Sequence, residues 1–206
     1  MRDDERPSPS RRVAAWCGVS LDGFSSGPDG PMHDTWLHRT AVRPSTEAHF
    51  EGVWRRASTV LIGRRNAEGF GAVWPGLSRS PDLSESSRAY GRFLTGVEKV
   101  VFSRSLPTDA MDGFAWDDVR VASDLEGEVR ALRDGDGGDV LVQNSASIIQ
   151  QLLRLDLLDD LRLMVVPVLL GGGLRLLDDV GAGEWDLAQS TTTAEGVLFL
   201  HYARHR

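Results

Sequence analysis

Apolar and polar positions alternate in blocks along this chain, and the clearest block runs from Gly138 to Gly173. A short apolar run, Val140 to Val142, is typical of a buried strand and ends in a polar turn. Apolar residues then recur at helical spacing from Ile148 to Leu155, and a second apolar run follows from Leu161 to Leu170. Because a helix of this length can connect parallel strands of one sheet, the block predicts a strand–helix–strand unit.

The polar turn inside this unit is the first candidate for function. Asn144 or Ser145 is expected to cap the helix by accepting from its free N–H groups. The same N–H groups and the positive end of the helix dipole suit a phosphate. Ligands of open α/β sheets also collect beyond the carboxyl ends of the strands. An ordinary, well-capped unit with nothing bound explains the turn equally well.

The rest of the chain adds elements on both sides of this unit. A helix is expected to open at Pro44, where Ser45 or Thr46 can cap it. Residues 25–43 predict an exposed loop, and residues 66–83 show a mixed pattern. Strands are expected at 13–19, 59–62, 99–103, 116–122, 184–193 and 196–202, helices at 83–96 and 125–134, and a short helical segment at 174–178.

These elements predict an α/β protein. We expect one three-layer α/β/α domain over residues 12–206, with a central mixed, mostly parallel sheet that ends in an antiparallel hairpin. Residues 1–11 are charged and contain proline and serine, so a disordered N-terminal tail is expected there.

Composition and charge narrow the class of function. The 206 residues carry a net charge of -7 without a strongly basic region, which argues against nucleic acid as the main partner. No apolar run is long enough for a membrane span and no signal core opens the chain, so a cytoplasmic protein is expected. The single cysteine, Cys17, lies in an apolar run and is expected in the core. It leaves no Cys-rich site, and no metal is predicted.

Four segments occur in an order and at spacings that resemble one family: Ser20–Gly23, Val60–Phe70, Lys99–Leu106, and the block above with Pro167–Gly173. Together they resemble the reductase domain of the bifunctional riboflavin-biosynthesis deaminase–reductase, a branch of the dihydrofolate reductase-like fold, over roughly residues 12–203. The resemblance implies a reductase that takes hydride from NADPH.

The resemblance also implies a cofactor site. A guanidinium fork is a good receptor for the phosphate that distinguishes NADPH from NADH. Solvated surface arginines are the alternative, because Lys99 is the one lysine among 23 basic residues and a genome-wide preference for arginine explains that. By position, Gly63, Arg64 and Arg65 match a turn at the cofactor phosphates, Ser103 and Arg104 a turn near the 2′-phosphate, and Gln143, Asn144, Ser145 and Ala146 the turn at the pyrophosphate.

Two carboxylates are the candidate catalytic residues, Asp22 in the first segment and Glu47. The stretch from Pro44 to Arg64 aligns without gaps with the dihydrofolate reductase stretch that carries the pterin-binding carboxylate, and Glu47 falls at that position. A carboxylate there can hydrogen-bond a pterin-like ring and guide a proton. A first-turn glutamate favoured by the helix dipole is the alternative. The candidate substrate-binding residues are Phe24, Trp36 and Gly172.

Several residues depart from the family pattern. Asn66 and Ala67 replace a threonine and an aromatic residue, and Asn144 replaces a glycine. Riboflavin-pathway members carry a lysine where Phe24 stands and a glutamate where Gln143 stands. The motif of the zinc deaminase half, His-x-Glu with Pro-Cys-x-x-Cys, does not occur in the sequence.

Three functions therefore compete. The leading hypothesis is an NADPH-dependent reductase of a small heterocyclic or carbonyl substrate. The second is a specific enzyme, either 5-amino-6-(5-phosphoribosylamino)uracil reductase proper or a dihydrofolate reductase-like pterin reductase. The third is a non-catalytic nucleotide-binding protein of the same fold. The resemblance favours a homodimer, in which the long apolar run at 161–170 and the final hairpin are buried in the sheet or in a two-fold interface.

Overall fold

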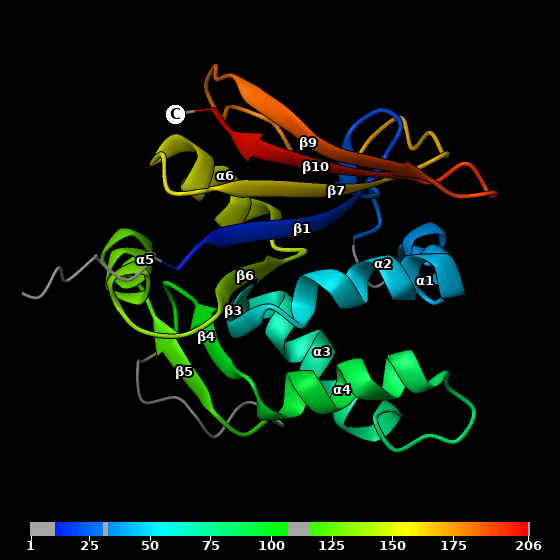
Figure 1. The fold of residues 1–206 in the computed structure, drawn as a ribbon, viewed down its shortest axis with the longest axis horizontal. Helices are drawn as coiled ribbons and strands as arrows, with labels where there is room; N and C mark the ends of the chain where they lie inside the picture. Colours follow the sequence, from blue (N-terminus) through cyan, green and yellow to red (C-terminus); the bar gives the residue numbers. More distant parts are fainter. Residues whose placement is uncertain (1–10, 31–32, 107–115, 206) are drawn as a thin grey trace, which may run out of the picture.

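The computed structural model describes residues 11–30, 33–106 and 116–205 (Figure 1). Eight of their strands form one mixed sheet in the order β5-β4-β3-β6-β1-β7-β10-β9, and β2 pairs with β8 in a separate two-stranded sheet. The strands are β1 (Val13–Ser20), β2 (Phe24–Ser26), β3 (Ala57–Gly63), β4 (Glu98–Phe102), β5 (Val119–Ala122), β6 (Asp139–Gln143), β7 (Asp160–Val166), β8 (Leu174–Arg175), β9 (Trp185–Thr192) and β10 (Leu198–Arg204).

Helices cover both faces of the sheet. Figure 1 shows α1 to α4 on one side of it and α5 and α6 on the other. This arrangement confirms the predicted three-layer α/β/α architecture. The helices are α1 (Thr35–Ala41), α2 (Pro44–Trp54), α3 (Arg64–Leu77), α4 (Glu85–Gly96), α5 (Leu125–Asp134) and α6 (Ala146–Arg154).

The strand directions also match the prediction. β1 lies between β6 and β7 and is parallel to both. The connection from β6 through α6 to β7 therefore crosses over β1, as expected for a right-handed crossover unit. β3, β4 and β5 extend the parallel part, whereas β10 runs antiparallel to both β7 and β9.

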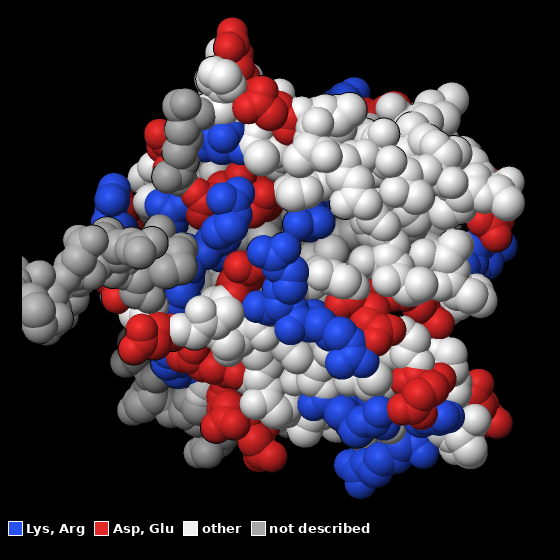
Figure 2. All heavy atoms as spheres, viewed as in Figure 1, with Lys and Arg blue, Asp and Glu red and all other residues white. Residues whose placement is uncertain are grey.

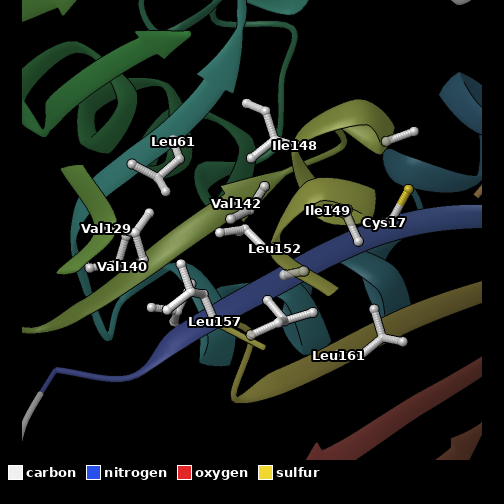
Figure 3. Packing of buried hydrophobic residues seen from close by; sticks show 14 of the residues in the cluster. Cys17, Leu61, Val129, Val140, Val142, Ile148, Ile149, Leu152, Leu157 and Leu161 are labelled. Carbon is white, nitrogen blue, oxygen red and sulfur yellow. The ribbon is translucent and has the colours of Figure 1, made fainter. Parts of the chain in front are cut away.

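The largest apolar cluster fills the layer between the sheet and the pair α5 and α6. Figure 3 shows side chains from β1, β3 and β6 meeting those of the two helices, with Leu61, Val142 and Ile149 among them. Cys17 belongs to this cluster, and burial raises the pKa of its thiol to about 12. The prediction of a core cysteine is therefore confirmed.

Three segments differ from the sequence prediction. Residues 25–43 contain most of β2 and all of α1, and residues 66–83 contain most of α3. Pro75 lies inside α3, in its last turn, so a proline that signals a break in the sequence is tolerated where few helical bonds remain. Residues 174–178 contain β8 rather than a helix. There Gly173, with a φ of +121°, lets the chain approach β2, because a Cβ would lie 2.1 Å from the Ser26 oxygen.

The ends of two elements also differ. β7 stops at Val166 and the run to Leu170 leaves the sheet, since Pro167 has no N–H to donate to a strand ladder. α2 begins at Pro44 with Arg43 at its N-cap and no side-chain cap bond, so the predicted capping by Ser45 or Thr46 is wrong. Both side chains lie inside the first turn, where Pro44 removes one N–H that would otherwise need a partner.

Arg11 belongs to the folded domain, although the sequence places it at the end of the predicted tail. It is 8% exposed, and its guanidinium donates to Gly138 O at 2.8 Å and to Thr59 Oγ1 at 2.7 Å. Residues 1–10 of that tail lie outside the described residues.

The Lys99 side chain binds carbonyl groups at the C-terminal end of α4. The side chain is 0% exposed, and Nζ donates to Leu94 O at 2.8 Å and Val97 O at 2.5 Å. It also lies 5.6 Å from the ring centroid of Trp116. A cation that bonds the last carbonyls of a helix satisfies groups that the helix itself cannot. Burial nevertheless lowers the Lys99 pKa to about 8.

We expect Lys99→Met to lower the free energy of unfolding by about 2 kcal/mol, because two buried carbonyls lose a charge-assisted partner. The native state of the wild type also releases the Lys99 proton at a lower pH than the unfolded chain, whose pKa is near 10.5. As pH rises from 8 to 10.5, the free energy of unfolding of the wild type should therefore increase relative to that of the variant. Urea unfolding across this range measures both effects. Exposed Arg104→Met is the control, and a parallel pH dependence of the wild type and Lys99→Met would contradict the assignment.

Candidate cofactor site at the carboxyl edge of the sheet

Three of the predicted turns lie side by side at one edge of the sheet. β4, β3 and β6 are neighbouring parallel strands, so their carboxyl ends meet there. The Gly63 amide donates to Ser145 Oγ at 2.9 Å, and Arg64 Nη1 donates to Ser105 Oγ at 3.1 Å. These bonds join the turn after β3 to the turns after β6 and β4. The residues matched to the cofactor are therefore brought together by the fold.

Two helices begin at this edge. α3 starts at Arg64, with Gly63 as its N-cap, and α6 starts at Ala146, with Ser145 as its N-cap. Neither helix has a side-chain cap bond. The first N–H groups of a helix have no acceptor within it, and they carry a partial positive charge. Two such ends on adjacent strands make this edge suitable for an anion.

The turn after β6 is held by side chains that the sequence analysis assigned to capping. Asn144 adopts a left-handed conformation with a φ of 47°, and its Oδ1 accepts from the Gly18 amide at 3.2 Å. Ser145 Oγ donates to Gln143 O at 3.1 Å. The predicted capping of α6 by Asn144 or Ser145 is therefore wrong, because both side chains bind neighbouring strands instead.

Asn66 supports the same turn, a role that the sequence analysis missed. Its Nδ2 donates to Asn144 O at 2.7 Å and lies 3.3 Å from Ser145 Oγ. Asn66 stands where the family pattern has threonine, and Asn144 stands where it has glycine. The two residues that differ from the pattern contact each other, which only the folded chain could reveal.

The arginines at this edge differ in what they contact. Arg64 forms an ion pair with Glu68 at 2.7 Å. The side chains of Arg65 and Arg104 are exposed and make no hydrogen bond or ion pair within residues 11–30, 33–106 and 116–205. Ser103 Oγ accepts from the Leu106 amide at 3.1 Å and so shapes the turn that carries Arg104. Arg65 and Arg104 are thus the arginines whose donors are available to a ligand.

Two residues of the pyrophosphate match lie in the interior. Gln143 is 3% exposed, and its side chain faces the Tyr90 hydroxyl of α4 without hydrogen-bond geometry. Burial raises the pKa of the Tyr90 phenol. Ala146 is buried at the start of α6. Their backbone, rather than their side chains, lies along the turn.

Asp22 ties two loops together. Its carboxylate accepts from the Ser20 hydroxyl at 2.7 Å and from the Gly171 amide at 2.7 Å, and the Leu170 amide is 3.2 Å away. The Ser20 hydroxyl, then the Gly171 amide, lower the pKa of Asp22 to about 2. The carboxylate is ionised and occupied by donors from the protein, which suits a structural bond between the loops that follow β1 and β7.

Glu47 makes its contacts with α4. Its oxygens accept from the Ser84 hydroxyl at 2.8 and 2.9 Å and from the Ser87 hydroxyl. Ser84 is also the N-cap of α4 and accepts from the Ser87 amide. The Glu47 side chain therefore joins the first turn of α2 to the first turn of α4. This place matches the alternative of a first-turn glutamate favoured by the helix dipole.

The three substrate-binding candidates lie in different surroundings. Phe24 is 6% exposed and packs under the Arg175 guanidinium, 4.4 Å from the ring centroid. Trp36 Nε1 donates to Asp34 Oδ1 at 2.9 Å. A Cβ on Gly172 would meet nothing within 4 Å. Each of the two aromatic side chains is thus held by a partner from the protein.

Two surface hollows lie away from this edge. One is lined by residues of α6, β7, β10 and the segment before β9, and the other lies between α3 and α4. In the described part of the chain, no group of three or more His, Cys, Asp or Glu residues could hold a metal ion. No helix of that part is long and apolar enough to cross a membrane.

Asp22→Asn tests the bond between the loops. The folded pKa of about 2 lies below the ordinary 3.8, so the carboxylate stabilises the native state above pH 3.8 and this contribution disappears as pH falls toward 2. We expect the variant to melt below the wild type at pH 7 and together with it near pH 2. Exposed Asp178→Asn is the matched control in thermal melts. An equal difference at both pH values would contradict the charged bond.

The chain was compared with known proteins. The model of the RibD C-terminal domain matches residues 11–199. The uncharacterized protein YyaP of Bacillus subtilis (strain 168) is 28% identical over 193 residues, which cover 93% of this chain and 94% of YyaP.

Solved structures share the fold at low sequence identity. A protein of Shewanella sp. PV-4 provisionally named for riboflavin biosynthesis has a TM-score of 0.70 and 20% identity, with 95% of this chain and 99% of that one covered. A deaminase and 5-amino-6-(5-phosphoribosylamino)uracil reductase from Thermotoga maritima has a TM-score of 0.63 and 15% identity, and the match covers 95% of this chain and 57% of that one. Since the family model spans most of the described fold, the chain belongs to the family of the RibD C-terminal domain, a reductase-like family with the dihydrofolate reductase-like fold.

Proposed function

We propose that this protein is an NADPH-dependent reductase of a small heterocyclic or carbonyl substrate. The observation that carries the proposal is the meeting of two uncapped helix N-termini with Arg65 and Arg104 at one edge of the sheet. Membership of a reductase-like family supports an oxidoreductase. The cofactor and the substrate class are our inference from the donors at that edge.

The donors fit the anionic parts of NADPH. The N–H groups at the starts of α3 and α6 suit the pyrophosphate, because they offer partial positive charge without a mobile side chain. Arg65 and Arg104 suit the 2′-phosphate, since their guanidinium donors have no partner among the described residues. Bound there, NADPH would supply the hydride, and the protein would orient the substrate and exclude water.

Asn66 and Ser145 would act as positioning residues. Their bonds to the turn after β6 and to the Gly63 amide keep the two helix starts at a fixed separation. A preorganised set of donors loses little freedom when an anion binds. The same bonds explain how the fold can keep an asparagine at a position where the family pattern has glycine.

The side chains at Asp22, Glu47 and Phe24 limit the substrates that the protein can bind. Neither Asp22 nor Glu47 is free of protein donors, so a substrate would have to displace the serine hydroxyls to use Glu47 as a partner. Phe24 stands where pathway members carry a lysine. These observations favour a small neutral ring or carbonyl compound over the phosphoribosylamino-pyrimidine. Substrate profiling with NADPH oxidation as the readout separates the two.

We expect NADPH to bind at least about tenfold more tightly than NADH, because one charge-assisted contact is worth about 1.5–3 kcal/mol. Arg65→Gln and Arg104→Gln should each weaken NADPH binding by about that factor and leave NADH binding unchanged. Calorimetric titration measures both affinities. Because the contacts are exposed, the preference should also shrink as salt is raised.

Arg92→Gln is the matched control for these titrations. Arg92 is exposed on α4, where it pairs with Glu85 at 2.6 Å, so its loss should not change either affinity. Equal affinity of the wild type for the two cofactors would remove the arginines from the site. No binding of either cofactor would support the non-catalytic alternative or a different ligand.

We also propose a homodimer in which the α6 side of the final hairpin is covered by a second copy. Leu177 and Leu187 are exposed on this side by 51% and 54%. The adjoining hollow, of about 400 Å³, is lined mainly by apolar side chains, including Trp185 and Tyr202. β9 is the edge strand of the sheet, and no strand of the described chain pairs with its outer side. Exposed apolar surface of this kind is typical of an interface.

Light scattering tests the assembly. We expect a mass near 45 kDa, twice the 22.6 kDa of one chain, and a shift to the monomer in Leu187→Arg, because a charge would then be buried in the interface. Val42→Arg is the control, as Val42 is 58% exposed at the C-terminal end of α1. A monomeric wild type at micromolar concentration would refute the dimer.

A further inference from the structure

Arg162 occupies an unusual place in the middle of β7. The strand lies inside the sheet, between β1 and β10. Its side chains alternate, and Leu161 and Leu163 belong to the cluster beneath α6. Arg162 therefore points to the opposite face, the one that carries α2. On this face it lies in register with Trp16 of β1 and His201 of β10.

The Arg162 guanidinium makes no hydrogen bond or ion pair with any of residues 11–30, 33–106 and 116–205. The residue is half-buried, and burial lowers the pKa of Arg162 below its ordinary value. A guanidinium offers five N–H donors and remains charged in proteins. None of the Arg162 nitrogens is among the buried side-chain atoms without a partner, so these donors remain within reach of solvent. A ligand that carries acceptors can therefore reach them.

The acidic groups near Arg162 are already engaged. Asp160 accepts from Arg12 Nε at 2.7 Å and lies 2.6 Å from His201 Nε2. Asp139 forms an ion pair with Arg56 at 3.0 Å. The charges of these two carboxylates and two arginines act on Arg162 electrostatically, but none of the four groups forms an ion pair with it. One positive charge of the group is therefore left over.

Two histidines complete the surroundings. His49 of α2 stacks on Phe199, with ring centroids 4.1 Å apart. Burial, then the charges of Arg162 and His201, lower the pKa of His49. Figure 2 shows that basic atoms form a band across the middle of the molecule, mixed with acidic atoms, in the region where Figure 1 places β1, β6 and α2. The positive charges of Arg12, Arg56 and Arg162 outnumber the carboxylates of Asp139 and Asp160 by one, which favours an anion at Arg162.

We propose that Arg162 is the centre of an oxoanion-binding site on the α2 side of the sheet, between β1, β7 and β10, with His49 and His201 beside it. The ligand class is a small molecule that carries a phosphate or carboxylate group, since a guanidinium fork matches both. The site differs from the predicted cofactor edge. Arg162 precedes the carboxyl end of β7 by four residues, roughly 13 Å of strand. β1 and β6 separate β7 from β3 and β4, the strands that Arg65 and Arg104 follow.

Titration with inorganic phosphate tests the site, with acetate as the carboxylate probe and chloride at equal ionic strength as the blank. We expect saturable binding in the millimolar range, seen as chemical-shift changes of the His49 and His201 ring protons. Because a bound anion favours imidazolium, the His49 pKa should rise toward its ordinary value. The stronger of the two probes identifies the oxoanion.

Arg162→Gln should weaken phosphate binding at least about tenfold. The same variant should melt above the wild type in chloride and below it in saturating phosphate, because the wild type alone is stabilised by the ligand. This reversal distinguishes a binding arginine from a structural one, whose loss would lower the melting temperature in both buffers. Arg162→Lys keeps the charge without the fork and should bind with intermediate affinity.

Arg55→Gln is the matched control. Arg55 is exposed at the end of α2 and pairs with Glu51 at 2.6 Å, so its removal changes the net charge of the region equally. Loss of binding in this variant would show that diffuse charge holds the ion and would overturn the site. So would unchanged binding in Arg162→Gln, or no saturable response in the wild type to either probe. Cofactor binding is not part of the readout, so the outcome is independent of NADPH.

Discussion

The left-handed turn at Asn144 holds the carboxyl edge of the sheet together. Its amide donates to Trp16 O at 2.9 Å, and its side chain accepts from the Gly18 amide. The same residue thus fixes the end of β6 to β1 by two bonds while its carbonyl receives Asn66 from α3. A glycine could adopt this backbone but could not make the bond to Gly18. The price in backbone freedom is small, because asparagine tolerates this conformation better than most residues.

The pattern of the sequence was sufficient for the layers and for most strands. Runs such as Val60 to Ile62 and Val140 to Val142 are buried on both faces, as parallel strands require, and they read as strands without further help. α1 was not predicted, since it follows a stretch rich in glycine and proline. α3 was not predicted, since it contains three glycines after its first turn and Pro75 near its end. Tertiary packing of Phe70 and Trp74 decides the helix there.

The candidate site was predictable in position but not in contacts. The order of the strands brings the turns after β3, β4 and β6 together, and that order follows from the resemblance to a known fold. Which arginine is available depends on geometry that no pattern shows, as the pairing of Arg64 with Glu68 illustrates. Likewise, the engagement of Asp22 by Gly171 spans 149 residues of sequence. Long-range bonds of this kind are invisible until the chain is folded.

Two buried or half-buried cations show how differently one fold can treat a positive charge. Lys99 donates to carbonyls at the end of α4, so its burial is compensated by the helix itself. Arg162 lies between strands whose carbonyls and amides already pair with each other, so the sheet offers it no acceptor. A helix end can satisfy a cation and the middle of a sheet cannot. A cation that leaves water needs acceptors. Lys99 finds them at the end of a helix and is structural, whereas the acceptors for Arg162 come from outside the chain.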